Sequence, residues 1–176
     1  GVCVFYNGVL IHHYSRTQAT VALSSAEAEL YAIGTGTIDG VSLLQFVREL
    51  GLPVQPKCSV FVYTDSSSAK SISTRLGSSR TTKHIHLRYL YVQDLVRAGL
   101  LDVIKTHTDK NVADLLTKYL SVERTKLLSS MLNLQAKVKH VHVQHYVQTP
   151  VHHLHLPSVC AIFCSSSYRQ ATVRHP

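Results

Sequence analysis

The stretch KCSVFVYTDSSSAKSISTRL, residues 57–76, joins an apolar run to a polar segment of helical character. The apolar run has the composition of a strand buried in a sheet, and it ends at Asp65. Three serines follow, and serine favours the start of a helix, so residues 66–76 are predicted to form a short helix. A buried strand that leads directly into a helix is typical of an α/β layer.

The segment before this junction predicts a hairpin, a third strand and a long helix. In VCVFYNGVLIHHYS, residues 2–15, an Asn-Gly pair interrupts an apolar run, which is the strongest short signal for a hairpin. We interpret ATVALS, residues 19–24, as a third strand. From Ser25 onward the apolar residues are spaced for one helical face, and this helix is expected to end near Gly51.

The segment after the junction alternates between helix and strand. IHLRYLYVQDLVRAG, residues 85–99, predicts a helix closed by its glycine, and LLDVIKTH, residues 100–107, predicts a strand. NVADLLTKYL, residues 111–120, is expected to open the next helix, which continues through residues 121–134. This order predicts a mixed α/β fold in which helices pack on a sheet.

The composition limits the setting and the partners of the protein. No apolar run in the 176 residues approaches the ~20 residues needed to span a bilayer, and no leader pattern precedes the first strand, so no membrane association is expected. The four cysteines are spread too unevenly for a disulfide framework, which favours a reduced, intracellular setting. The net charge of +8 favours nucleic acid as a partner, although a merely soluble basic protein would have the same charge.

The character of the sequence changes after Gln135. Residues 136–176 contain seven of the twelve histidines and no acidic residue. We therefore divide the chain into a domain over residues 1–135 and a basic, His-rich tail over residues 136–176, which is expected to be poorly ordered. A second interpretation stays open, because imidazole-rich tracts bind transition metals such as zinc or nickel.

Three carboxylates are candidates for a cation site at one edge of the sheet: Glu29, Asp65 and Asp114. Carboxylates brought together at strand ends hold divalent cations, which activate water in phosphodiester cleavage. Glu27 lies three residues after Ser24, which is the spacing of a capping box, and we assign it to the helix end. Each of the three candidates taken alone has an ordinary reading as a cap, a turn residue or an acid in the first turn of a helix.

Four stretches in this order resemble the ribonuclease H domain of copia-type retrotransposon Pol polyproteins. They are SRTQATVALSSAEAELYAI (15–33), VYTDSSSAKSI (62–72), SSRTTKHIHLRYLYVQDLV (78–96) and KTHTDKNVADLLTK (105–118). The resemblance covers residues 1–135 and implies a ribonuclease H-like mixed sheet. It also implies hydrolysis of the RNA strand of an RNA–DNA hybrid, within a polyprotein that includes a reverse transcriptase, in a cytoplasmic particle or the nucleus.

The resemblance implies roles for individual residues. It places the catalytic and metal-binding carboxylates at Glu29, Asp65 and Asp114, with Mg²⁺ as the cofactor and Mn²⁺ as an alternative ion. His107 lies in the loop in which cellular ribonucleases H carry a histidine that assists proton transfer or product release. Ser24 and Ser25 occupy the turn that in this fold touches the minor groove of the hybrid.

The loop over residues 78–84 adds two candidate contacts to nucleic acid. Arg80 and Lys83 are predicted to contact phosphates because of their charge and their place in this polar loop. A solvated basic loop without a ligand has the same composition.

The chain departs from the family at its start. The family's first catalytic aspartate lies on a strand upstream of a segment that resembles residues 1–15, so we expect an N-terminally truncated domain whose first strand is missing. That strand would sit in mid-sheet, beside the strand that ends at Asp65, and one candidate to fill its place is SVCAIFC, residues 158–164. Whether this chain cleaves hybrids therefore stays open, and a catalytically dead nucleic-acid-binding remnant is the alternative.

Overall fold

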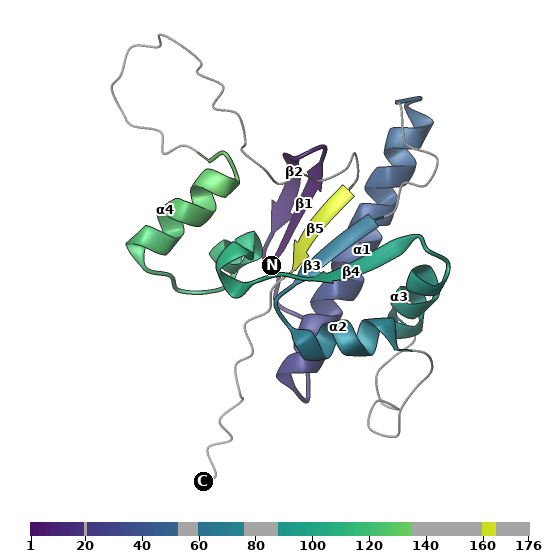
Figure 1. The fold of residues 1–176 in the computed structure, drawn as a ribbon, viewed down its shortest axis with the longest axis horizontal. Coiled ribbons are helices and arrows are strands. Elements are labelled where there is room, and N and C mark those ends of the chain that lie inside the picture. Colours follow the sequence, from purple (N-terminus) through teal and green to yellow (C-terminus); the bar gives the residue numbers. More distant parts are fainter. Residues whose placement is uncertain (20, 53–59, 76–87, 135–159, 165–176) are drawn as a thin grey trace.

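The structure, a computed structural model, describes residues 1–19, 21–52, 60–75, 88–134 and 160–164 (Figure 1). The strands form one five-stranded sheet. The fold is mixed α/β, as the sequence predicts, because helices lie between the strands along the chain and pack on the sheet.

A hairpin opens the chain. Strands β1 (Val2–Tyr6) and β2 (Val9–Tyr14) are antiparallel, and Asn7 and Gly8 form the turn with φ values of 49° and 78°. Positive φ at both positions is the requirement of a type I′ turn, which Asn-Gly meets at little steric cost. The predicted hairpin is confirmed.

The third strand predicted over residues 19–24 is wrong. The described residues of this segment contain no strand, and Val21 and Leu23 are exposed. Ala22 between them is buried, but the two larger side chains point to solvent and the segment pairs with no described strand. The long helix follows as predicted: α1 spans Ser25–Glu49.

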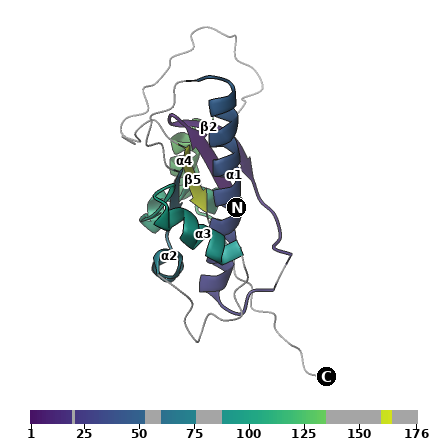
Figure 2. The same ribbon diagram turned by 90° about the vertical axis from the view of Figure 1, so that its right-hand side faces the viewer.

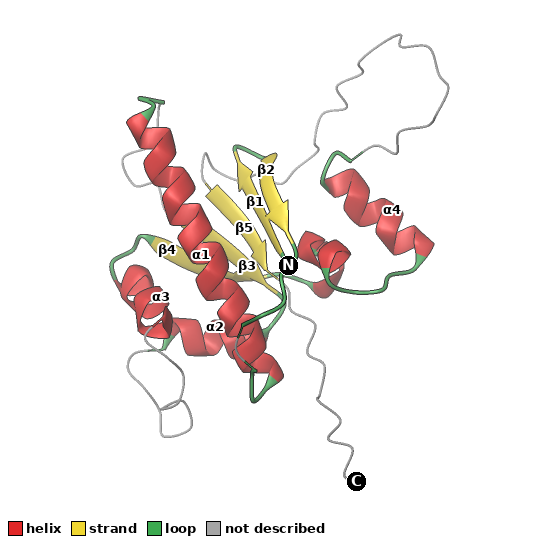
Figure 3. Ribbon diagram, turned by 180° about the vertical axis from the view of Figure 1, so that it is seen from behind, coloured by secondary structure: helices red, strands yellow, loops and turns green. Residues whose placement is uncertain are grey.

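Two parallel strands and two short helices form the second half of the sheet region. Strand β3 (Val60–Thr64) leads into α2 (Ser67–Thr74), and α3 (Arg88–Arg97) leads into strand β4 (Leu101–Lys105). The two strands pair in parallel, with Thr64 opposite Lys105. Helix α1 crosses the strands on one face of the sheet (Figure 3).

Strand β5 (Cys160–Cys164) lies in the middle of the sheet, which has the order β2-β1-β5-β3-β4. It pairs antiparallel with β1, with Val4 opposite Ile162, and parallel with β3, with Thr64 opposite Cys164. The predicted position of this segment, between the hairpin and the strand that leads to Asp65, is confirmed for residues 160–164. Residues 160–164 therefore belong to the sheet, and the division of the chain at residue 135 leaves out one of its strands.

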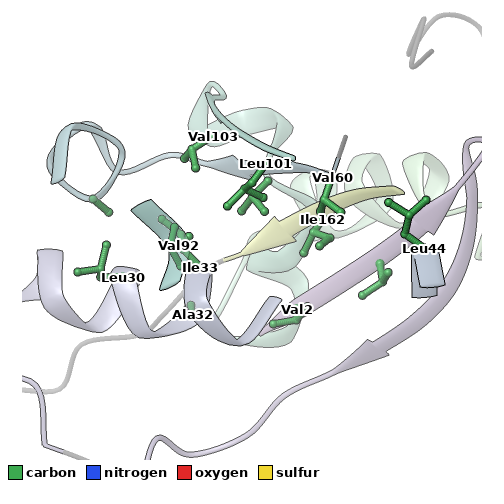
Figure 4. Packing of buried hydrophobic residues seen from close by; sticks show 13 residues of the cluster. Val2, Leu30, Ala32, Ile33, Leu44, Val60, Val92, Leu101, Val103 and Ile162 are labelled. Atoms are coloured by element: carbon green, nitrogen blue, oxygen red, sulfur yellow. The ribbon is translucent and has the colours of Figure 1, made fainter. Parts of the chain in front are cut away.

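The core on the α1 face of the sheet follows the alternation of the strands. Val2 and Val4 point into this cluster, whereas Cys3 and Phe5 of the same strand point into a second cluster on the opposite face. Ile162 is fully buried in the first cluster, on the strand that lies between the strands of Val2 and Val60 (Figure 4).

The opposite face is covered by the 3₁₀ helix η3 (Val112–Leu116) and by α4 (Val122–Met131). The sequence predicts an α-helix where η3 lies; the structure has a tighter helix there, which ends before Thr117. The side view shows α1 running alongside the strands (Figure 2). By length and composition alone α1 could cross a membrane, but it packs on the sheet, and Leu30, Ile33 and Leu44 are buried in the core.

Candidate carboxylate site

Glu27 caps helix α1. Its backbone N–H donates to Ser24 Oγ at 3.1 Å, and its carboxylate accepts from the backbone N–H of Leu23 and from the hydroxyl of Tyr31, both at 2.7 Å. This is the reciprocal pattern of a capping box, except that the carboxylate accepts from the N–H of Leu23, one residue before the cap residue Ser24. The assignment of Glu27 to the helix end is confirmed.

Tyr31 depends on the same carboxylate. Burial raises the pKa of Tyr31 from its ordinary value of 10.0 to about 12, and the hydrogen bond to Glu27 and its negative charge add to the effect. Glu27 thus connects the first turn of α1 to the second. Glu29, two residues further on, is also buried, at 9% exposure.

Asp65 and Asp114 converge on one cationic side chain, and we call these two residues the carboxylate pair. Asp65 directly follows β3, and Asp114 lies in η3 with a fully buried side chain. Lys118 Nζ is 2.9 Å from Asp114 Oδ1 and 3.6 Å from Asp65 Oδ2. Two acids that are far apart in the sequence therefore lie at the same edge of the sheet.

Arg124 is a second cation at this edge. Its Nη2 is 3.3 Å from Asp114 Oδ2 and donates to the backbone carbonyl of Thr108 at 2.7 Å. Its Nη1 is 3.1 Å from Asp109 Oδ1. Both oxygens of the buried Asp114 are therefore paired with a positive charge, which offsets the cost of burying an ionised carboxylate.

The pKa of Lys118 is affected by all three candidate carboxylates. Partial burial alone would lower its pKa, but the hydrogen bond to Asp114 and the charges of Asp114, Asp65 and Glu29 outweigh burial and raise it. Glu29 thus lies within electrostatic range of the ammonium group. These four residues and Arg124 make a compact charged region.

The donor set fits a divalent cation in part. Within the ranges that the structure describes, no group of three or more His, Cys, Asp or Glu side chains is arranged to hold a metal ion. Asp65 and Asp114 supply carboxylate oxygens, the ligands that Mg²⁺ prefers, and they already share one cationic partner. The arrangement therefore suits a cation between two carboxylates, with Glu29 as a further negative charge nearby.

The other predicted site residues lie apart from the carboxylate pair or outside the described residues. His107 is exposed; its Nδ1 accepts from the backbone N–H of Asp109, and no hydrogen bond or ion pair connects it to the carboxylate pair in the described contacts. Ser24 and Ser25 are exposed at the start of α1, where the Ser24 hydroxyl serves as the cap. Arg80 and Lys83 lie outside the described residues.

Sequence reasoning missed three cations at this edge. Lys118 and Arg124 pair with Asp114, and Lys105 donates to the backbone carbonyl of Asp65. The signal for Lys118 was present, because it follows Asp114 by four residues, the spacing at which helical side chains meet. No comparable spacing signal pointed to Arg124, whose approach depends on how α4 packs.

The fold and the charged region define a mixed α/β domain with an acidic site beside the carboxyl ends of parallel strands. In sequence, the chain is similar to parts of retrovirus-related Pol polyproteins from plant transposons. It is 32% identical over 136 residues, 77% of its length, to the Pol polyprotein of transposon TNT 1-94 from Nicotiana tabacum. It is 30% and 28% identical, over 65% of its length, to the Pol polyproteins of transposons RE2 and RE1 from Arabidopsis thaliana.

The chain spans only a small part of these relatives, 10% of the first and 8% of the other two. No family model matches the chain, and no solved structure matches it. The relationship to Pol polyproteins is thus established by sequence, while the particular domain has to be argued from the fold and the site.

Proposed function

We propose that this chain is the ribonuclease H region of a copia-type Pol polyprotein, which binds RNA–DNA hybrids and hydrolyses their RNA strand with Mg²⁺, or with Mn²⁺ in its place. Its natural partner is then the reverse transcriptase portion of the same polyprotein, in an intracellular setting. The observation that carries the proposal is the convergence of Asp65 and Asp114 on a single cationic group beside the sheet.

The topology supports this proposal. A hairpin, a central strand antiparallel to it and two parallel strands form a sheet whose order matches the one that the resemblance implies. The central place, which the resemblance gives to a strand before the hairpin, is taken by β5. Strand β5 runs antiparallel to β1 and parallel to β3.

The chemistry at the site follows from its charges. Asp65 and Asp114 would hold the divalent cation, with Glu29 completing the negative field, and a cation so held supplies an activated water and stabilises the leaving oxygen. The exposed Lys105 at the same edge suits the phosphate backbone of a nucleic acid. Arg124 holds Asp114 in place through its contact with Oδ2.

The experiment that tests the proposal is cleavage of an end-labelled RNA–DNA hybrid in the presence of Mg²⁺. We expect cleavage of the RNA strand that is lost in Asp114→Asn and in Asp65→Asn, while Asp94→Asn, at an exposed ion pair on α3, behaves as the native chain. If the native chain neither cleaves the hybrid nor binds it, the proposal is contradicted.

A second candidate function is a nucleic-acid-binding module without catalysis. The observation that favours it is the state of Asp114, whose two carboxylate oxygens are both engaged by cationic side chains. In this case the native chain binds the hybrid without cleaving it, and Asp65→Asn leaves that affinity unchanged. Loss of affinity in Asp65→Asn would speak against it.

A further inference from the structure

The ammonium group of Lys118 lies between the two members of the carboxylate pair. The separations of 2.9 Å from Asp114 and 3.6 Å from Asp65 place a positive charge in contact with both carboxylates. A divalent cation bound to both carboxylates would need much of the same space, because Mg²⁺ lies about 2.1 Å from its oxygen ligands. The ammonium group and such an ion therefore exclude each other.

The position of Lys118 allows it to enter and leave this space. Its backbone N–H donates to the carbonyl of Asp114 at 2.9 Å, which anchors the base of the side chain. The side chain is 34% exposed, so its end has a path to solvent. A lysine stem of four carbons can swing by rotation about its own bonds, without a change in the backbone.

The burial of the carboxylate pair creates a need for a counter-ion. The side chain of Asp114 is fully buried and that of Asp65 is 12% exposed. Two buried carboxylates that share one cationic partner repel each other unless positive charge lies nearby, and in the described contacts Arg124 pairs with Asp114 but not with Asp65. In the absence of a metal ion, Lys118 is the described side chain that bridges the two.

We propose that Lys118 is an internal counter-ion that competes with divalent cations for the carboxylate pair and thereby sets the cation affinity of the site. This inference rests on the proposed metal-dependent function. The lysine stabilises the metal-free protein and is displaced when the ion binds. The site is then filled by Lys118 at low cation concentration and by the ion at high concentration.

The test is thermal unfolding of the full chain during titration with MgCl₂ or MnCl₂, without nucleic acid. Lys118→Met removes the charge and keeps the length of the stem. We expect it to melt at a lower temperature than the native chain in the absence of metal, and to bind the cation at least ~tenfold more tightly. The matched control is Lys126→Met, the same charge change at an exposed position of α4, which is expected to titrate as the native chain does.

A cation affinity of Lys118→Met equal to that of Lys126→Met would overturn the proposal. If Lys118→Met is unfolded without metal, the proposal requires that Mg²⁺ restores folding, and failure to do so overturns it as well. Lys118→Gln, which keeps a hydrogen-bond donor without the charge, is expected to show the same gain in affinity. Adding Asp65→Asn to Lys118→Met is expected to abolish the gain, which locates the ion at the carboxylate pair.

The experiment distinguishes failure of this proposal from failure of the proposed nuclease. Tighter cation binding by Lys118→Met together with no cleavage of any hybrid would keep the role of Lys118 and reject the enzyme. Cleavage by the native chain with unchanged cation affinity in Lys118→Met would do the reverse.

Discussion

Two neighbouring glutamates in α1 have different surroundings although they lie two residues apart. Glu27 accepts hydrogen bonds from Leu23 and Tyr31, so its carboxylate is committed to the start of the helix. Glu29 is buried within electrostatic range of Lys118, on the side of the carboxylate pair. One carboxylate is therefore assigned to the helix and the other to the charged region.

The first prediction concerns the cap. We expect Glu27→Ala to lower the free energy of unfolding by about 1–2 kcal/mol, because the partly buried N–H of Leu23 and the hydroxyl of Tyr31 lose their acceptor. Glu123→Ala, at an exposed acid in the first turn of α4, is the control and is expected to cost less than about 0.5 kcal/mol. Urea denaturation of both variants measures the difference, and equal costs would mean that Glu27 contributes little to the helix end.

The second prediction concerns alkaline pH. The folded state holds the pKa of Tyr31 at about 12, above its ordinary 10.0, so folding favours the neutral phenol. This stabilisation is complete below pH 10 and is lost as the pH rises from 10 towards 12. We expect Tyr31→Phe to flatten the fall in unfolding free energy over this window, measured by urea denaturation at several pH values. Tyr119→Phe, at a fully exposed side chain, should leave the fall as it is in the native chain.

Strand β5 is the element on which the sheet depends, because it pairs with β1 on one side and β3 on the other. Without it the hairpin and the β3–β4 pair would each present an unpaired edge, with backbone groups that need partners. It also brings the fully buried Ile162 into the main core. Its place in the sheet joins the two halves that carry the site.

The third prediction tests this packing. Ile162→Ala is expected to lower the free energy of unfolding by about 3 kcal/mol, the usual cost of truncating a buried isoleucine. The control is Ile11→Ala, the same change at a half-exposed position of the edge strand β2, with an expected cost within about 0.5 kcal/mol. Chemical denaturation measures both, and similar small costs would contradict the central place of β5.

The elements show which parts of the fold the sequence could predict. Local signals were sufficient for the hairpin at Asn7-Gly8, for α1 and for β3, because turn chemistry and periodicity act over a few residues. The strand expected over residues 19–24 failed because alternation alone does not supply a partner strand. The position of β5 was predicted only from the gap that the resemblance implied in the sheet. The ion pairs of Arg124 could not be predicted, because they depend on how α4 packs.

The molecule as a whole is a sheet completed by a segment distant in the sequence. Residues 160–164 come after β1 to β4 along the chain and lie between β1 and β3 in space (Figure 1). The carboxylate pair depends on this arrangement. Asp65 directly follows β3, which pairs with β5. Asp114 lies in η3, which packs on the face of the sheet opposite to α1. Fold and site are therefore coupled through one strand.

The fourth prediction compares two truncated chains. A chain of residues 1–159 lacks β5 and is expected to lose cooperative unfolding, because two sheet edges and part of the core are left open. A chain of residues 1–166 keeps β5 and is expected to melt as the full chain does. Scanning calorimetry compares the two, and a cooperative transition of unchanged midpoint for residues 1–159 would mean that the sheet does not need β5.

The most direct measurement is native-state hydrogen exchange at the backbone amides of β5. If residues 160–164 form the central strand, their paired amides should exchange only through the large-scale unfolding that also exposes β1 and β3, and should show the same opening free energy as those strands. Exchange of these amides at the rate of an unstructured peptide, with β1 and β3 still protected, would contradict the central position of β5 and the site that is built upon it.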